Sequence, residues 1–168
     1  MELHLTGRRA LVTGGSKGIG FASARELVAE GAHVASCARS QAEIHAAAET
    51  LRVAGGTVHA QTTDVTDPRQ VSDLVAQSAA ALGGLDILVN NAGAAHPGPF
   101  ESLTDADWHG DLDVKLFSQI RCKRASITYL RASAAPRVIN TNSVYARSPD
   151  TSFFATTVNR AACLNLSK

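Results

Sequence analysis

The chain has 168 residues, about the length of one domain. Apolar residues make up 45% and charged residues 18%, a composition that allows a core and excludes an intrinsically disordered protein. The formal net charge of +1 argues against nucleic acid or an anionic membrane surface as a partner. No apolar run approaches the roughly 18 residues of a membrane span, so the sequence predicts no transmembrane helix.

The cysteines and histidines show no pattern typical of a disulfide framework or a metal site. Cys37, Cys122 and Cys163 lie far apart and form no Cys-x-x-Cys pair. The six histidines have no metal-ligand spacing, so we expect no metal. Residues 1–9 lack the apolar core of a signal peptide, and we expect a cytoplasmic protein.

Short apolar runs alternate with helical patterns along the whole chain. Strands are predicted, in chain order, at Ala10–Val12, His33–Cys37, Thr57–Ala60, Ile87–Val89 and Arg137–Asn140. The helical patterns that follow them have apolar positions beginning at Ala24, Ile44, Val71, Trp108 and Phe154. The pattern from Trp108 through Leu112, Leu116 and Ile120 predicts one long helix that runs toward Arg131.

Several helix ends carry their own sequence signals. Gly31 ends the first predicted helix. Asp67 before Pro68 is typical of a cap followed by proline at the first helical position. Thr104 and Asp107 resemble a capping box in which aspartate replaces the usual glutamate or glutamine.

Strands separated by helices of this length pair in parallel through right-handed crossovers. We therefore predict an α/β fold, a Rossmann-like doubly wound parallel sheet in three α/β/α layers, formed by a single domain over residues 1–168. The chain stops at Lys168 inside a helical pattern, and the fifth strand forms an exposed sheet edge. We therefore expect the domain to be incomplete.

A glycine-rich loop, Thr13-Gly14-Gly15-Ser16-Lys17-Gly18-Ile19-Gly20, joins the first predicted strand to the first predicted helix. Glycines permit a tight turn and a close approach of the backbone to a pyrophosphate, and the helix N-terminus supplies N–H groups and partial positive charge. The placement favours a dinucleotide site, whereas the alternative is a turn that only connects the two elements. A nucleoside triphosphate loop is excluded, because no Gly-Lys-Ser/Thr follows at the required spacing.

Together with this loop, three further segments resemble the short-chain dehydrogenase/reductase family. Leu88-Val89-Asn90-Asn91-Ala92-Gly93 is similar to the family motif after the fourth strand, Asp64-Val65 to the pair beside the adenine ring, and Ser143 to the catalytic serine. The resemblance covers nearly the whole chain. It implies a Rossmann fold whose last strands are missing here. It also implies cofactor contacts at Gly14, Ser16, Lys17, Gly18, Ile19, Gly20, Asp64, Val65, Asn91, Ala92 and Gly93.

The second predicted strand favours NADP over NAD. An acidic residue near the end of that strand binds the ribose 2′-hydroxyl of NAD, but no Asp occurs between Gly20 and Asp64. Arg39 stands there instead, and with Lys17 it can pair with a 2′-phosphate. We therefore expect NADPH as cofactor, the alternative being that both are solvated surface charges.

The sequence departs from the family at three of its four catalytic positions, which are Asn, Ser, Tyr and Lys. The family spacing places Thr156 where the tyrosine belongs, Arg160 where the lysine belongs and Lys115 where the asparagine belongs. No other register restores Tyr-x-x-x-Lys, because Tyr129 and Tyr145 are the only tyrosines and neither has a lysine four residues later.

The remaining groups suggest a non-standard proton donor. Ser143 can hydrogen-bond a substrate oxygen, and Arg160 can hold the ribose but cannot give up a proton. Lys115 is the leading donor, because desolvation near another cation lowers the pKa of an amine, and Tyr145 comes second. Thr156 is a poor acid. The alternatives are a solvated Lys115 and a Tyr145 that only packs.

Three functional hypotheses compete. The first is an NADP-dependent oxidoreductase that acts on a carbonyl, alcohol or quinone-like small molecule. The second is a catalytically silent dinucleotide-binding protein, a sensor or an oligomer subunit, and the third, weaker one is a methyltransferase-like nucleotide fold. Ala161 and Ala162 are small enough for close helix approach, and the resemblance implies a homo-oligomer, a dimer or tetramer.

Overall fold

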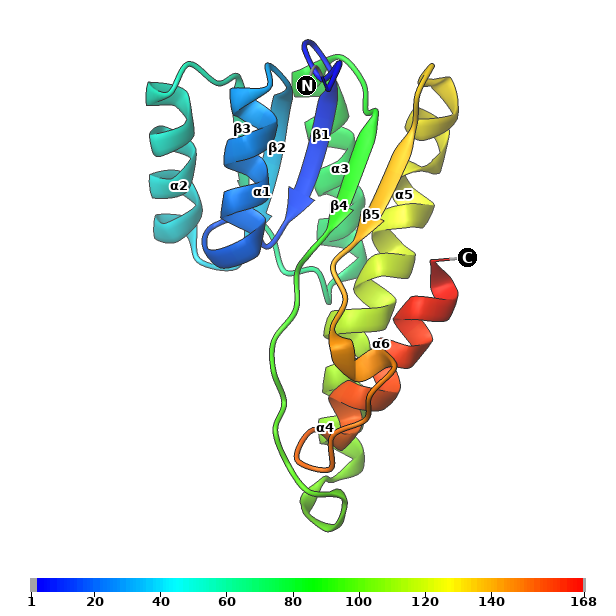
Figure 1. Cartoon of the computed structure of the whole chain (residues 1–168). Helices are drawn as coiled ribbons and strands as arrows, with labels where there is room; N and C mark the ends of the chain where they lie inside the picture. Colours follow the sequence, from blue (N-terminus) through cyan, green and yellow to red (C-terminus); the bar gives the residue numbers. More distant parts are fainter. Residues whose placement is uncertain (1–2, 168) are drawn as a thin grey trace.

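The computed structural model describes residues 3–167 and contains all five predicted strands, with ends that differ from the prediction by at most two residues (Figure 1). The strands are β1 (Arg9–Thr13), β2 (His33–Ala38), β3 (Val58–Thr62), β4 (Ile87–Asn90) and β5 (Arg137–Asn140). The helices are α1 (Gly18–Ala29), α2 (Gln41–Val53), α3 (Pro68–Leu82), α4 (Asp105–Leu112), α5 (Ser118–Ala132) and α6 (Phe154–Leu166). The sequence places the end of the chain at Lys168 inside a predicted helical pattern. Lys168 lies outside the described residues.

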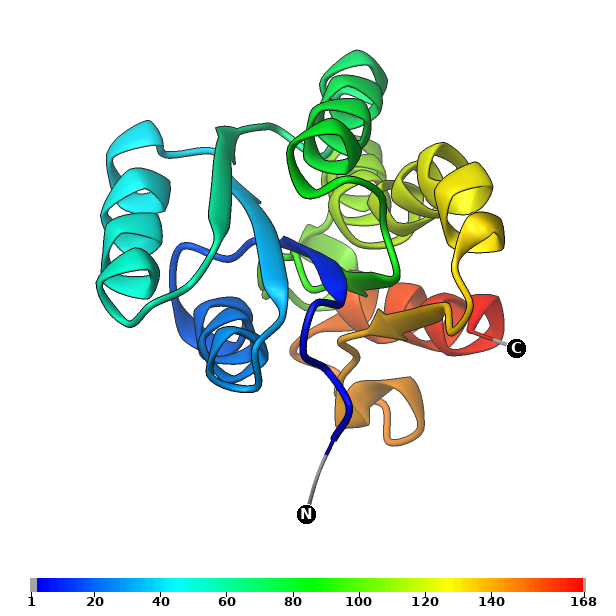
Figure 2. The same ribbon diagram turned by 90° about the horizontal axis from the view of Figure 1, so that it is seen from above.

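The sheet confirms the predicted doubly wound fold. All strand pairs are parallel, and the strand order is β3-β2-β1-β4-β5. Leu11 of β1 pairs with Ala35 of β2 on one side and with Leu88 of β4 on the other. Figure 2, viewed from above, shows helices on both faces of the sheet. The order reverses between β1 and β4, which is where sheets of this kind open a crevice at the carboxyl ends of their strands.

Each face of the sheet has its own apolar core. Against α1 and α2 lie Ala10, Val12, Ala24, Val28, Val34, Ala48, Leu51, Val58, Ile87 and Val89. Against α3 and α5 lie Leu11, Ala35, Cys37, Val65, Val71, Leu74, Val75, Leu85, Leu88, Cys122 and Leu130. The central strands are apolar on both sides because helices cover both faces.

The predicted helix caps are confirmed. Asp67 accepts hydrogen bonds from the backbone N–H groups of Arg69 and Gln70, and Pro68 occupies the first helical position. Thr104 and Asp107 form a complete capping box, since each side chain accepts from the other residue's backbone N–H. These caps satisfy N–H groups that the first helical turn leaves without partners.

The long predicted helix is continuous but contains a π-helical turn, Asp113–Phe117, between α4 and α5. Its predicted apolar stripe, Trp108, Leu112, Leu116 and Ile120, is only half-buried. The fully buried stripe lies beside it and begins with polar side chains, Asp111, Lys115, Ser118 and Gln119, before it continues through Cys122, Ser126 and Leu130. The apolar pattern therefore found the helix but not the face that it buries.

The π-helical turn keeps this buried stripe in line. From Asp111 to Leu130 the stripe advances about 19 residues in five steps of roughly one turn each. A straight α-helix of 3.6 residues per turn would drift by about 100° over that length. The wider turn at Asp113–Phe117 absorbs the drift, so the part of the helix beyond the sheet and the part packed on it present the same face inward.

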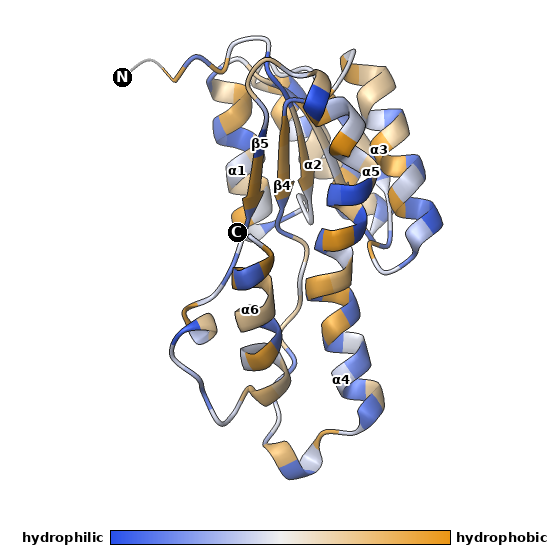
Figure 3. Ribbon diagram, turned by 90° about the vertical axis from the view of Figure 1, so that its right-hand side faces the viewer, coloured by the Kyte–Doolittle hydropathy of each residue, from blue (hydrophilic) through white to orange (hydrophobic). Residues whose placement is uncertain are grey.

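The last helix and the last strand show a similar departure from the apolar pattern. Val158, an apolar position of the predicted α6, is 52% exposed, whereas Thr156 and Asn159 are buried. β5 forms one edge of the sheet, and Val138 and Ile139 on it remain exposed. Figure 3 shows β5 as an apolar strand at this edge, while α4 and α6 carry mixed apolar and polar residues beyond the carboxyl ends of the strands.

Asp86 joins the start of the sheet to α5. Its carboxylate accepts from the backbone N–H of Arg9 at 3.0 Å, from Arg9 Nε and Nη2 at 2.8 Å each, and from Ser133 Oγ at 2.6 Å. These donors, chiefly Arg9, hold the pKa of Asp86 well below its usual range. The side chain is 4% exposed, so its charge depends on these partners.

We expect Asp86→Ala to lower the free energy of unfolding by about 2–4 kcal/mol, because it removes one partner of a largely buried pair. Urea unfolding at pH 7 measures this. The control is Glu26→Ala, which removes an exposed ion pair with Arg25 and should cost less than about 1 kcal/mol. Equal stability of the two variants would contradict the role given to Asp86.

The ion pair between Arg9 and Asp86 also makes the stability of the fold depend on pH in the acid range. Because the folded-state pKa of Asp86 is lowered, its contribution is present above the unfolded pKa of about 3.9 and is lost as the pH falls below it. The stability of the wild type should therefore fall more steeply below about pH 4 than that of Asp86→Asn.

Candidate functional site

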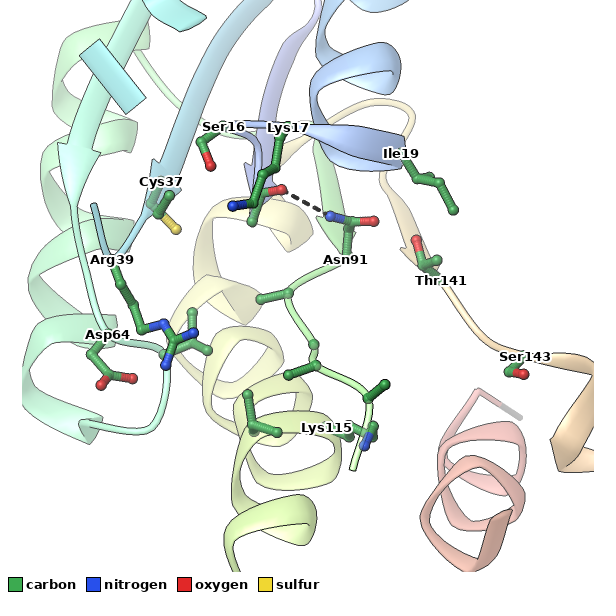
Figure 4. A pocket seen from close by; sticks show the side chains of 18 of the residues that line it. Ser16, Lys17, Ile19, Cys37, Arg39, Asp64, Asn91, Lys115, Thr141 and Ser143 are labelled. Carbon is green, nitrogen blue, oxygen red and sulfur yellow. Dashed lines mark hydrogen bonds between the residues drawn. The ribbon is translucent and has the colours of Figure 1, made fainter. Parts of the chain in front are cut away.

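A cavity of about 650 Å³ opens at the carboxyl ends of the strands, between the sheet and the segment formed by the π-helical turn and α6 (Figure 4). Most of the residues predicted for the site line this one cavity, and they are Gly14, Ser16, Lys17, Ile19, Arg39, Asp64, Val65, Asn91, Ala92, Gly93, Lys115, Ser143, Tyr145, Thr156 and Arg160. Gly18 and Gly20 do not line it and instead shape the loop that does.

The loop after β1 can pass close to β4 only because it contains glycines. Gly14 has a positive φ of 67°, and a Cβ there would lie 2.9 Å from the Cα of Ala92. A Cβ at Gly20 would lie 2.2 Å from the carbonyl oxygen of Gly14. The loop leads into α1, whose N-cap Lys17 makes no side-chain cap and whose first turn contains no acidic residue. The N–H groups of that turn therefore suit an anion.

Asn91 and Thr13 clamp this loop to the end of β4. Asn91 Nδ2 donates to the carbonyl oxygens of Thr13 at 3.0 Å and Gly14 at 3.1 Å, and a dashed line in Figure 4 marks a bond of this side chain. In return, Thr13 Oγ1 accepts from the backbone N–H groups of Asn91 at 3.0 Å and Ala92 at 3.1 Å. The clamp fixes the two strand ends between which the cavity opens.

The charges at the β2 side of the cavity differ from the sequence expectation in one respect. Glu43 of α2 also lines the cavity, and its carboxylate lies 3.3 Å from Lys17 Nζ and 3.3 Å from Ser16 Oγ. The sequence predicts that Arg39 and Lys17 face the cofactor without a nearby carboxylate. That prediction is wrong, because it considers only the end of β2 and not the following helix α2, which carries Glu43. Arg39 is exposed and makes no ion pair within residues 3–167.

Cys37 lies at the floor of this region. Burial raises the pKa of its thiol to about 12, so the group is a neutral, unreactive wall of the cavity. Cys122 and Cys163 are also buried and free.

The opposite end of the cavity holds the predicted catalytic residues that follow β5. Ser143 Oγ accepts from the backbone N–H of Tyr145 at 3.3 Å, which leaves its own O–H to donate. The ring of Tyr145 stacks on Phe153 with centroids 5.4 Å apart, and both rings line the cavity. Phe153 was not among the residues predicted for the site.

Arg160 lies beside the loop after β4. Its Nη1 donates to the carbonyl oxygen of Thr141 at 2.9 Å, and its Nε is buried without a partner in the described part of the chain. A Cβ at Gly93 would lie 3.4 Å from Nη2, so glycine at this position leaves room for the guanidinium. Arg160 therefore supplies a positive charge at this end of the cavity.

Lys115 is not solvated, which excludes one alternative left open by the sequence. The residue lies in the π-helical turn and is 1% exposed, and its ammonium donates to Asp111 and to Thr156 Oγ1, the latter at 3.0 Å. Burial lowers the pKa of Lys115, Asp111 opposes that effect, and the charge of Arg160 lowers the pKa further. The expected lowering is thus present, with desolvation as its main cause.

Two residues of this region were missed by the sequence analysis. Asp111 pairs with Lys115 one helical turn later, and Asn159 Nδ2 donates to the other oxygen of Asp111 at 2.5 Å. An aspartate four residues before a lysine on a helix is a recognisable ion-pair pattern that could have indicated Asp111. No local sequence pattern indicates that Asn159 belongs to the site. It reaches Asp111 only because α6 packs against α4.

Two classes of site find no support within the described part of the chain. Residues 3–167 contain no group of three or more His, Cys, Asp or Glu side chains placed to hold a metal ion. Over the same residues, every helix is too short or too polar to cross a bilayer.

Comparison with known proteins identifies the family. The sequence model of the short chain dehydrogenase family matches residues 8–166, and the chain belongs to that family. A 2,3-dihydro-2,3-dihydroxybenzoate dehydrogenase of Bacillus subtilis is 29% identical over 98% of this chain and 63% of its own length. A putative ketoacyl reductase of the monensin polyketide synthase of Streptomyces virginiae is 39% identical over 80% of this chain and 52% of its own length.

Solved structures agree on the fold. An NADPH-bound short chain oxidoreductase of Pseudomonas aeruginosa with an atypical catalytic center is 38% identical, with a TM-score of 0.91 over 94% of this chain and 62% of that chain. The L-sorbose reductase of Gluconobacter frateurii, solved with NADPH and L-sorbose, is 31% identical, with a TM-score of 0.96 over 99% of this chain and 64% of that chain. The chain thus spans between about half and two thirds of these relatives.

The close approach at Gly20 yields a stability prediction. Gly20→Ala places a methyl group against backbone atoms of Gly14, and we expect it to destabilise the protein by about 1–3 kcal/mol. The control is Gly110→Ala in the exposed interior of α4, where a Cβ meets nothing within 4 Å and alanine should stabilise by about 0.5–1 kcal/mol. Thermal unfolding measures both, and a stabilising Gly20→Ala would show that the loop tolerates a side chain.

Proposed function

We propose that the protein is an NADP-dependent oxidoreductase that transfers hydride between the nicotinamide and a carbonyl, alcohol or quinone-like substrate. One observation carries the proposal: the glycine loop and the proton-bearing groups Ser143 and Lys115 line the same cavity. NADPH-bound relatives of the same fold support the choice of cofactor.

The cavity fits a dinucleotide at three points along its length. The uncapped first turn of α1 after Lys17 offers N–H groups and partial positive charge to a pyrophosphate. Arg39 follows β2 directly, and Lys17 of the loop after β1 lines the same cavity, so a 2′-phosphate bound there would pair with Arg39 and compete with Glu43 for Lys17. At the other end, the guanidinium of Arg160 lines the cavity beside Gly93 and can donate hydrogen bonds to a ribose.

When bound, the dinucleotide supplies or accepts hydride, and the chain's own residues handle the proton. Ser143 donates a hydrogen bond to the substrate oxygen and stabilises its developing negative charge. The ammonium of Lys115 donates the proton, while Arg160 stays charged and orients the ribose. Thr156, which accepts from Lys115 Nζ, helps to orient that ammonium rather than acting as an acid.

The aromatic pair at the cavity supports a flat substrate. Tyr145 and Phe153 stack with an interplanar angle of 23° and expose apolar surface to the cavity beside Ser143. A ring system can pack against such a surface. A hydroquinone anion is also a weaker base than an alkoxide and demands less from the acid, so we propose quinones or diketones rather than simple ketones as substrates.

A second candidate function is that of a silent dinucleotide-binding protein. The neutralisation of Lys115 by a buried carboxylate favours it, since a tightly held ammonium can serve only to satisfy Asp111. This function predicts NADPH binding without NADPH consumption. Stopped-flow measurement of NADPH oxidation against a panel of ketones, diketones and quinones separates the two functions.

The exterior of the long helix and α6 supports a homo-oligomer. Phe117, Ile127 and Val158 are exposed apolar side chains on these helices, and Ala161 and Ala162 permit close approach of a partner helix. We propose that a twofold partner covers this surface. Light scattering at micromolar concentration should give the mass of a dimer or tetramer, and a monomeric mass would contradict this.

NADPH should bind more tightly than NADH, because Arg39 and Lys17 meet a phosphate that NADH lacks. We expect Arg39→Ala to weaken NADPH binding by about 1.5–3 kcal/mol, or about 10- to 150-fold, with little effect on NADH. Calorimetric titration of both nucleotides measures this. Arg69→Ala, an exposed arginine on α3 away from the cavity, is the control, and equal affinities in the wild type would contradict the assignment.

Loss of the proton donor should lower turnover without affecting cofactor binding. General acid catalysis contributes typically about 10²–10⁴-fold, so Lys115→Met and Ser143→Ala should each reduce kcat by roughly that factor and leave the Kd for NADPH nearly unchanged. The loss should be smaller for quinones than for ketones. If Lys115→Met and Tyr145→Phe both keep full activity, the proton comes from another source.

A further inference from the structure

Four buried polar residues from two helices form one cluster behind the cavity wall. Asp111 and Lys115 come from the long helix, Thr156 and Asn159 come from α6, and none is more than 6% exposed. Lys115 and Thr156 line the cavity, whereas Asp111 and Asn159 lie behind them and do not. A buried charge of this kind persists only where partners satisfy it.

Asp111 accepts most of the hydrogen bonds within the cluster. Lys115 donates to Oδ1 of the carboxylate, Thr156 Oγ1 lies 3.4 Å from the same oxygen, and Asn159 Nδ2 donates to Oδ2. Lys115 has three N–H bonds, and Asp111 and Thr156 accept two of them. The third N–H has no acceptor among the described residues, and the Lys115 side chain lies at the end of the cavity below Asn91 (Figure 4).

We propose that Asp111 is a positioning residue, anchored by Asn159, that keeps Lys115 charged and aims its remaining N–H at the substrate oxygen. This rests on the proposed function, in which Lys115 is the proton donor. Without Asp111, burial would favour the neutral amine, which has no proton to give to the substrate oxygen. The carboxylate thus decides whether Lys115 acts as an acid or a base.

In this proposal, the proton moves from Lys115 to the substrate oxygen during reduction. As hydride adds to the carbonyl carbon, a C–H bond forms and the electron pair of the C=O π bond moves to oxygen. That oxygen takes the proton of the free N–H of Lys115, so an O–H bond forms and an N–H bond breaks. The neutral amine regains a proton from solvent water once product leaves, and Asp111 stays ionised throughout.

The charged groups around Lys115 come from both helices that pack on it. Burial lowers the pKa of Lys115, the hydrogen bond and charge of Asp111 on α4 raise it, and Arg160 on α6 lowers it. Cys163, also on α6, donates its S–H to the carbonyl oxygen of Lys115 and is neutral because burial raises the pKa of its thiol. Asp111 is therefore the main group that favours the charged form of Lys115.

Asp111→Asn tests the proposal, because it removes the charge and keeps the shape. An opposite charge at this range typically shifts a pKa by about 1–3 units, so the alkaline limit of the kcat profile should move to lower pH by about that amount. The Kd for NADPH should stay within about twofold. The matched control is Asp113→Asn on the same helix, whose carboxylate pairs with Arg121 outside the cluster and whose profile should match the wild type.

A second readout does not depend on turnover. The protein is labelled with ¹³Cε-lysine, the signal of Lys115 is assigned by its loss in Lys115→Met, and its titration is followed by NMR with NADPH bound. The wild-type signal should be that of an ammonium at pH 7 and should titrate about 1–3 units lower in Asp111→Asn. A neutral Lys115 in the wild type would overturn the proposal, and this measurement remains decisive if Asp111→Asn does not fold.

These measurements test the role of Asp111 and the oxidoreductase assignment independently of each other. If substrates turn over but Asp111→Asn shifts neither the kcat profile nor the Lys115 titration, the role of Asp111 is wrong and the oxidoreductase assignment stands. If Asp111→Asn shifts the Lys115 titration but no substrate is turned over by the wild type, the placement of the ammonium stands and the oxidoreductase assignment fails.

Discussion

The hydrogen bonds between Thr13 and Asn91 hold together the two strand ends on which the site depends. β1 and β4 are neighbours at the point where the strand order reverses, so the chain leaves them in opposite directions and opens a crevice. Without the clamp, the loop around Gly14 would have no fixed distance from the segment after β4. The positions of the uncapped first turn of α1 and of the cavity wall that carries Arg160 both depend on this junction.

Much of the fold could be predicted because its determinants are local. Each strand is a short apolar run, and Asp67, Pro68 and Gly83 mark helix ends through backbone chemistry that acts within a few residues. The glycine loop is likewise recognisable within eight consecutive residues, Thr13 to Gly20. Most of the residues that the motifs predict for the site line one cavity.

The rest could not be predicted, because it depends on packing between distant elements. Glu43 reaches Lys17 from the next helix, Phe153 stacks on Tyr145 across a turn, and Asn159 meets Asp111 only where α6 crosses α4. The apolar pattern also chose the wrong face of the long helix, because the buried stripe there is polar. Local rules tend to fail at functional positions, where the chemistry of the site overrides the preference for an apolar core.

Because of the π-helical turn at Asp113–Phe117, the geometry of the site depends on the number of residues in this segment as well as on their identity. Removing a single residue from this turn would restore a regular α-helix and rotate one part of it by about 100° relative to the other. Either Asp111 and Lys115 would leave α6, or Cys122 and Leu130 would leave the core. Natural variation in this segment should therefore be confined to substitutions, with insertions and deletions excluded by the geometry of a single turn.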